Sequence, residues 1–230
     1  MTTLLVFDTA SESMTIGLMH EGRSWSHAGA GGAKASAALI PAILALLAEA
    51  DIPLDAVDAI GFGRGPGAFT GLRTACSVAQ GLAFGAAKPV IPIDNLLCVA
   101  ASARAGRDPF RVWATIDARM DQIYAAEYLC VADRWQVLQE PMLTDCEELG
   151  ERWQREPPDA VAGDALRVFG SRLQTGQAER LADARIDAPT LLELAARAWR
   201  DGQCVAAAAA LPLYVRDKVA ETTLEREARR

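Results

Sequence analysis

Residues 59–71 read AIGFGRGPGAFTG, a glycine-rich junction between an apolar run and a helix. The short, mostly apolar run 57–62 predicts a buried strand. Further glycines flank Pro66 in a loop, and a helix begins near Phe69 with Thr70 as a candidate N-cap. Two interpretations compete: a phosphate-binding loop at a helix N-terminus, or a rigid corner where two helices or two chains pack closely.

A helix is expected over 70–84, and its residue pattern favours the interpretation of the loop as a rigid corner. Small residues recur at every fourth position and therefore share one helix face: Gly71, Ala75, Ala79 and Ala83. Leu72, Cys76 and Leu82 lie beside them, so apolar character covers much of the circumference. A surface helix has one apolar stripe, so we expect this helix to be covered on two sides, once by its own sheet and once by another element.

The chain before this helix predicts a first lobe. Alternating and apolar runs indicate three antiparallel strands at 3–7, 15–19 and 23–28. A helix over 36–49 follows, with apolar residues at Leu39, Ile40, Ile43, Leu44, Leu46 and Leu47, a stripe wider than one buried face requires. A further strand is expected at 90–93.

The same order of elements returns after Phe110. We expect three strands and then a helix and a short strand, at 111–116, 123–129, 134–139, 145–155 and 160–162. Asp8 and Asp117 take equivalent places, each ending a first strand before a hairpin. Such repetition predicts two lobes of one architecture. We expect a surface loop at 171–189 and a helix at 190–199, and no glycine-rich loop recurs in the second lobe.

Composition excludes several classes of protein. The 230 residues are 51% apolar, which gives ample material for a core. The net charge of −7 argues against tight nucleic-acid binding by this chain alone. Five scattered cysteines form no CxxC or Cys/His cluster, and the two histidines form no HxxxH pair, so neither a disulfide framework nor a metal site is expected. A reducing cytoplasm fits this cysteine usage best, and no run is long enough to span a membrane.

One polar site is open to two interpretations. Asp8 and Thr9 at a strand end, together with Gly65 and Gly67, could hold a phosphate or a hydrated metal ion. The alternative, which we favour, is an Asx turn in which Asp8 bonds its own backbone. Asp117 and Arg119 predict an internal ion pair that braces a loop.

Five runs resemble the bacterial TsaB (YeaZ) family, whose members are needed for threonylcarbamoyladenosine in tRNA. They are LLVFDTAS at 4–11, GRGPGAFTGLR at 63–73, AQGLA at 79–83, IDARMDQIYAA at 116–126 and PLYVRDKVA at 212–220. The resemblance implies an α/β fold with two RNase H-like lobes of the actin, hexokinase and Hsp70 ATPase superfamily. We expect an N-terminal lobe over 1–97, a degenerate C-terminal lobe over 98–214 and a terminal segment over 215–230 that returns to the first lobe or frays.

The resemblance also implies a paralogue, TsaD, which transfers threonylcarbamoyl from its adenylate to the tRNA adenosine next to the anticodon. TsaD-type proteins carry a metal-binding HxxxH on their first helix, whereas residues 32–38 here contain no histidine. The expected role is thus a non-catalytic scaffold, with no catalytic residue, metal or intrinsic cofactor, that binds TsaD and works with TsaE. Residues expected at the TsaD interface are Leu39, Ile40, Ile43, Leu44, Leu47, Leu72, Ala75, Cys76, Ala79 and Leu82.

Further expectations concern the assembly. We expect a homodimer when TsaD is absent, a nucleotide (ATP or ADP) only at the complex interface, and tRNA contact that is indirect, assisted at most by Lys34 and basic tail residues such as Arg216. The rival function is a nucleotide-binding enzyme of the actin-like superfamily that acts on its own through Asp8, Thr9 and the glycine loop. Replacing Leu72 or Ile43 by Asp and testing TsaD binding is the experiment that the sequence suggests.

Overall fold

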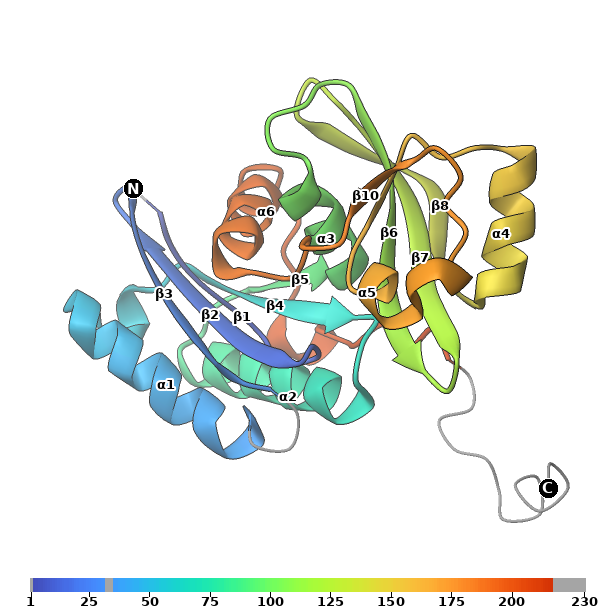
Figure 1. Ribbon diagram of the computed structural model, residues 1–230. Coiled ribbons are helices and arrows are strands. Elements are labelled where there is room, and N and C mark those ends of the chain that lie inside the picture. The colour runs from blue at the N-terminus through green and yellow to red at the C-terminus, as the bar shows by residue number, and fades with distance from the viewer. Residues whose placement is uncertain (1, 32–34, 217–230) are drawn as a thin grey trace, which may run out of the picture.

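The computed structural model of the protein describes residues 2–31 and 35–216. Within them the chain forms two five-stranded sheets, ordered β3-β2-β1-β4-β5 and β10-β9-β6-β7-β8. Read from its opposite edge, the second sheet repeats the order of the first. The predicted duplication and the α/β class with two RNase H-like lobes are confirmed (Figure 1).

The first sheet combines an antiparallel meander with a parallel pair. Its strands are β1 (Thr3–Asp8), β2 (Ser13–His20), β3 (Arg23–Ala30), β4 (Ala59–Gly65) and β5 (Val90–Asp94). Leu5 pairs with Leu18 in the antiparallel direction and with Ile60 in the parallel direction. All of β1 is buried, because helices cover both faces of the sheet. The helices α1 (Ala35–Ala50) and α2 (Phe69–Gly85) cover one face side by side (Figure 1).

The second sheet follows the same plan, but its strands β9 and β10 are only three residues long. Its strands are β6 (Phe110–Arg119), β7 (Gln122–Val131), β8 (Arg134–Thr144), β9 (Ala160–Ala162) and β10 (Glu179–Leu181). The helices α4 (Cys146–Arg155) and α5 (Ala165–Phe169) cover its outer face, where Trp113 packs edge-on against Trp153. Asp117 lies near the end of β6 as Asp8 ends β1, so the two aspartates occupy equivalent places as predicted.

Two helices join the lobes. The layer between the sheets consists of α3 (Asn95–Ala103) and α6 (Ala188–Arg200) (Figure 1). One apolar cluster runs from Leu4 and Val6 in β1 through these helices to Val112 in β6 and Tyr128 in β7. An interface of this kind disfavours hinge motion, so we regard the lobes as one packed unit.

The structure differs from the sequence expectation at several elements. The helix α3 follows β5 directly and was not expected, and β10 lies inside the predicted surface loop 171–189. The N-cap of α2 is Ala68, with no side-chain cap, and Thr70 is already helical. The division at 97 and 214 stays a prediction, although Leu192 of α6 packs close to Gly17 of the first sheet. Residues 217–230 and Lys34 lie outside the described part.

Among the described residues the chain also forms three short 3-10 helices: η2 (Leu54–Ala56), η3 (Gly170–Arg172) and η4 (Ala207–Ala209). None of the helices in residues 2–31 and 35–216 is long and apolar enough to cross a membrane.

Candidate functional site

The outward face of α1 is apolar although it meets solvent. Ile40 is 43% exposed and Leu44 is 52% exposed, and the small or apolar residues around them on this face are Ala37, Pro41, Ala45 and Ala48. The only charged residue of the helix is Glu49, near its C-terminus. On the neighbouring α2, Phe84 is 84% exposed. The two neighbouring helices thus expose three large apolar side chains, Ile40, Leu44 and Phe84, which we together call the helix surface.

The remaining predicted interface residues belong mostly to the protein's own core. In α1 these are Leu39, Ile43 and Leu47, all buried against the first sheet. In α2 they are Leu72, Ala75, Cys76 and Ala79, also buried, while Leu82 is half-buried. A side chain that its own chain already covers is not available to a partner, so the predicted interface was too broad. The wide apolar stripe on α1 therefore consists of two faces. One face packs in the core, and the other meets solvent or a partner.

A second side of α2 is covered by the C-terminal stretch of the same chain. The Cys76 thiol donates to the Ala210 carbonyl at 3.3 Å, and the Gln80 amide donates to the same oxygen at 2.8 Å. Val205 and Ala207 pack on the same core cluster. The C-terminal stretch around η4 therefore covers the side of α2 that carries Cys76 and Gln80. Gly71, in the row of small residues, instead packs against Thr9 and Ala10 of the β1–β2 turn.

The glycine-rich loop is closed by buried polar groups. A Cβ atom on Gly63 would come 2.1 Å from Asp8 Oδ2 and 2.6 Å from Asn95 Oδ1, so no room remains there for a phosphate. The Gly65 amide donates to Asn95 Oδ1 at 3.3 Å, and the Ala68 amide donates to the Ala10 carbonyl at 2.8 Å. These two amides are satisfied within the chain, and the phosphate interpretation of the remainder of the loop stays a prediction.

Asp8 and Thr9 are wholly buried and tie the loop to β1. The Ala10 amide donates to Asp8 Oδ1 at 3.0 Å, which is the Asx-type contact favoured from the sequence. Asn95 Nδ2 donates to Asp8 Oδ2 at 3.2 Å, and the Thr9 hydroxyl donates to the Gly71 carbonyl at 2.7 Å. Burial raises the pKa of Asp8 from 3.8 to about 6, and the hydrogen bonds from Ala10 and Asn95 offset part of that rise.

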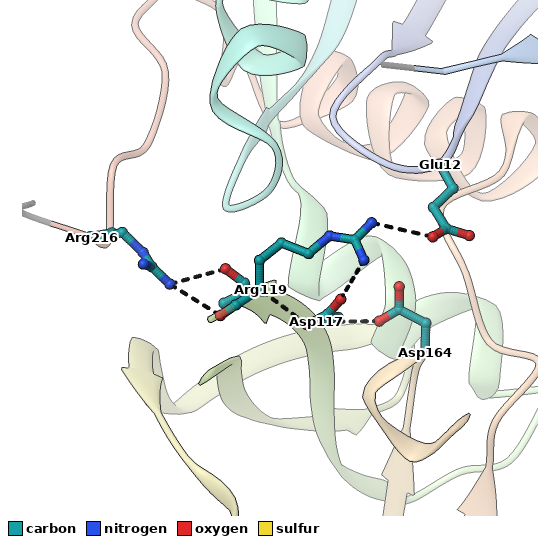
Figure 2. Close-up of polar contacts among 6 residues, drawn as sticks. Glu12, Asp117, Arg119, Asp164 and Arg216 are labelled. Carbon is teal, nitrogen blue, oxygen red and sulfur yellow. Dashed lines mark hydrogen bonds and ion pairs between the residues drawn. The ribbon is translucent and has the colours of Figure 1, made fainter. Parts of the chain in front are cut away.

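A cleft of about 640 Å³ lies between the lobes. The β1–β2 turn, the loop before α2, the β6–β7 hairpin and residues 184–186 and 213–216 line it. At its mouth Arg119 contacts Asp117 Oδ2 at 3.0 Å, which confirms the predicted ion pair, and reaches Glu12 of the other lobe at 3.3 Å (Figure 2). Asp164 Oδ1 accepts from the Asp117 amide at 2.9 Å, and burial raises the pKa of Asp164.

A terminal strap, residues 211–216, crosses this cleft, and the sequence did not predict it. The Leu213 amide donates to the Arg64 carbonyl at 2.7 Å. Tyr214 stacks near Phe69, with ring centroids 5.5 Å apart, and its hydroxyl accepts from Arg73 Nε at 3.1 Å. Arg216 donates to the Ala118 carbonyl at 2.9 Å in the other lobe (Figure 2). Only the PLYVR run hinted that this segment has a role.

These features define a class first: an α/β protein of two fused RNase H-like lobes, with an apolar helix surface and an interlobe cleft. A family model described as "TsaD: tRNA N6-adenosine threonylcarbamoyltransferase" matches residues 32–162, more than half of the chain. The tRNA threonylcarbamoyladenosine biosynthesis protein TsaB of Haemophilus influenzae is 33% identical, with 94% of each chain covered. The corresponding TsaB of Escherichia coli is 31% identical over 94% of this chain and 96% of its own.

The chain belongs to the TsaB family. A solved structure, YeaZ from Pseudomonas aeruginosa, is 38% identical and superposes with a TM-score of 0.83, covering 93% of this chain and 100% of its own. The resemblance inferred from the five sequence runs is therefore confirmed at the level of family and fold.

Proposed function

We propose that this protein is a non-catalytic subunit that binds TsaD and supports threonylcarbamoyl transfer to the tRNA adenosine next to the anticodon. The names of its relatives assign those proteins to threonylcarbamoyladenosine biosynthesis, which supports the same pathway here. No group of three or more His, Cys, Asp or Glu side chains in the described ranges is placed to hold a metal ion.

The helix surface is the observation that carries the proposal. Apolar side chains on adjacent helices that remain in water mark a site of protein association. The TsaD family model matches residues 32–162, which include both α1 and α2, so a TsaD-type partner would carry an equivalent helix pair. Pairing like helices across two chains would bury Ile40, Leu44 and Phe84 in a four-helix contact. In the absence of TsaD the same surface would pair with a second copy.

Other parts of the proposal rest on the family resemblance. TsaE would act on the TsaD complex, a nucleotide would bind at the complex interface, and tRNA would be contacted indirectly. A cytoplasmic location fits a role in tRNA modification.

The test replaces both exposed α1 residues by aspartate, as Ile40→Asp with Leu44→Asp. Each carboxylate would have to be desolvated at the contact, so we expect TsaD affinity to fall about 30-fold or more. Val168→Asp is the matched control, since Val168 is 55% exposed on α5 of the other lobe. Isothermal titration with purified TsaD measures the affinity, and circular dichroism checks that both variants fold.

Unchanged affinity of the folded double variant would show that α1 does not contact TsaD. The buried residues Ile43 and Leu72 are unsuitable for this test, because aspartate there would unfold the protein rather than probe an interface. Titration of the isolated protein with ATP and ADP addresses the rival nucleotide-binding function, and micromolar affinity for either nucleotide would favour it.

A further inference from the structure

The interlobe cleft is a second candidate site that the helix surface does not use. Its volume of about 640 Å³ lies in the range of small-molecule sites. The apolar cluster that α3 and α6 form with both sheets holds its walls in place. Binding there would therefore need no closure of the lobes.

Arg119 projects from the tip of the β6–β7 hairpin at the mouth of this cleft. Arg119, Met120 and Asp121 have φ values of 61°, 55° and 63°, which side-chain-bearing residues rarely adopt in succession. Arg172 anchors the tip through bonds of 2.8 and 2.6 Å to Asp121, and Arg216 anchors it through the Ala118 carbonyl. Positive φ at Met120 and Asp121 is the usual geometry of a two-residue hairpin turn, and the positive φ of Arg119 extends it by one residue. This tip is the centre of the IDARM run, to which the helix surface gives no role.

The cross-cleft partner of Arg119 is readily displaced. Arg119 is satisfied by Asp117 on its own strand, whereas Glu12 reaches it only at 3.3 Å. The side chains of Arg119 and Glu12 are 71% and 81% exposed, and exposed ion pairs of this kind contribute little. An incoming anion could replace the Glu12 carboxylate without disturbing the Asp117 pair.

Two more guanidinium groups line the cleft without a carboxylate partner. Arg216 donates to main-chain carbonyls and to Met120 Sδ, and the side chain of Arg185 has no partner among the described residues. The carboxylates that line the cleft are Glu12, Asp117 and Asp164. Asp117 is neutralised by Arg119, and one oxygen of Asp164 accepts from the Asp117 amide. Once Glu12 is displaced, the mouth of the cleft favours an anion.

The remaining wall is apolar and aromatic. Phe69 and Tyr214 form a ring pair on one side, and Tyr124, Ile186 and Val99 line the interior. A cleft lined by both aromatic rings and guanidinium groups suits a flat, partly apolar ligand that carries a negative charge.

We propose that the interlobe cleft binds a small organic anion with an aromatic body, whose carboxylate or phosphate replaces Glu12 on Arg119. The proposal does not depend on TsaD binding, because none of these residues lies on the helix surface. If the cleft bound no anion, the proposed scaffold function would be unaffected. If TsaD did not bind the helix surface, the proposal for the cleft would be unaffected.

Two matched pairs of probes test it by titration on the full-length protein. N-acetyltryptophan and N-acetyltryptophanamide differ by a carboxylate, and 1-naphthyl phosphate and 1-naphthol differ by a phosphate. We expect the charged member of at least one pair to bind about tenfold more tightly than its neutral counterpart. The pair that shows the preference identifies whether the cleft selects a carboxylate or a phosphate. No binding up to about 2 mM, or equal affinity within both pairs, would overturn the proposal.

Three variants test the role of the cleft residues. Glu12→Gln removes the competing carboxylate and should tighten binding of the preferred anion about threefold or more, a gain that a purely structural Glu12 would not give. Arg119→Gln should abolish the charge preference, while Arg155→Gln, an exposed arginine on α4, should leave it unchanged. Binding that Glu12→Gln weakens, or a preference that survives in Arg119→Gln, would refute the assignment.

Discussion

Gly71→Ala should destabilise the protein by about 4 kcal/mol, one of the largest effects expected of a single methyl group in this chain. A Cβ atom at position 71 would come 2.1 Å from the Thr9 carbonyl oxygen and 2.8 Å from the Ala10 Cα atom. Both are main-chain atoms of the β1–β2 turn and cannot rotate away. To make room, α2 would have to move from the turn, and the buried hydrogen bonds that Thr9 and Ala10 make to its first turn would lengthen.

Gly81→Ala in the same helix provides the matched control. Nothing lies within 4 Å of a Cβ atom at position 81, and the residue is exposed. Alanine is a better helix former than glycine, so this variant should gain about 0.5–1 kcal/mol. Urea unfolding of both variants at one protein concentration gives the two free energies. Equal effects would mean that the close contact at Gly71 does not limit stability.

The sequence predicted the architecture well because local patterns determine it. Two related lobes were predicted from three local patterns. These are the alternation of apolar residues in the strands, the repeated order of elements and the equivalent positions of Asp8 and Asp117. The elements that it missed, α3, α5 and β10, have weak local signals, and α5 is only five residues long. The helix α3 begins directly after β5 at Asn95 without a side-chain cap, and β10 is three residues long.

The sequence could not separate the two faces of the N-terminal helices. Ile40 and Ile43 have the same side chain in the same stripe, yet one is 43% exposed and the other is fully buried. Which face meets the sheet depends on the packing of α1 on β2 and β3, and for α2 on the return of residues 205–213 from the far end of the chain. Periodicity identifies an apolar helix, but it does not identify the neighbour that covers it.

Long-range polar contacts were equally hidden. Asn95 lies 87 positions from Asp8, and Arg216 lies 98 positions from Ala118, yet each pair is joined by a hydrogen bond. The Asp117–Arg119 pair was predictable because its members are two residues apart. The Asp117–Arg119 ion pair could therefore be predicted from the sequence. The contacts that close the glycine loop and anchor the terminal strap are seen only in the folded chain.

Burial of Asp8 should make the protein less stable as the pH rises from about 4 to about 6. The folded-state pKa of about 6 exceeds the ordinary value of 3.8, so the folded protein binds the proton more tightly than the unfolded chain. The free energy of unfolding therefore falls across that window and is flat above it as far as this group is concerned. A difference of about two pH units corresponds to about 3 kcal/mol.

Asp8→Asn removes this titration, so the difference in unfolding free energy between the wild type and this variant should decrease as the pH rises from about 4 to about 7. The amide cannot reproduce both acceptor contacts of the carboxylate to Ala10 and Asn95, which adds a pH-independent cost of about 1–2 kcal/mol. Asp121→Asn is the control of opposite sign, since Arg172 lowers the pKa of Asp121 and its contribution is lost as the pH falls. Urea titrations at a series of pH values measure all three proteins. A wild-type minus Asp8→Asn difference that stays constant with pH would mean that Asp8 is not held in an environment that disfavours its charge.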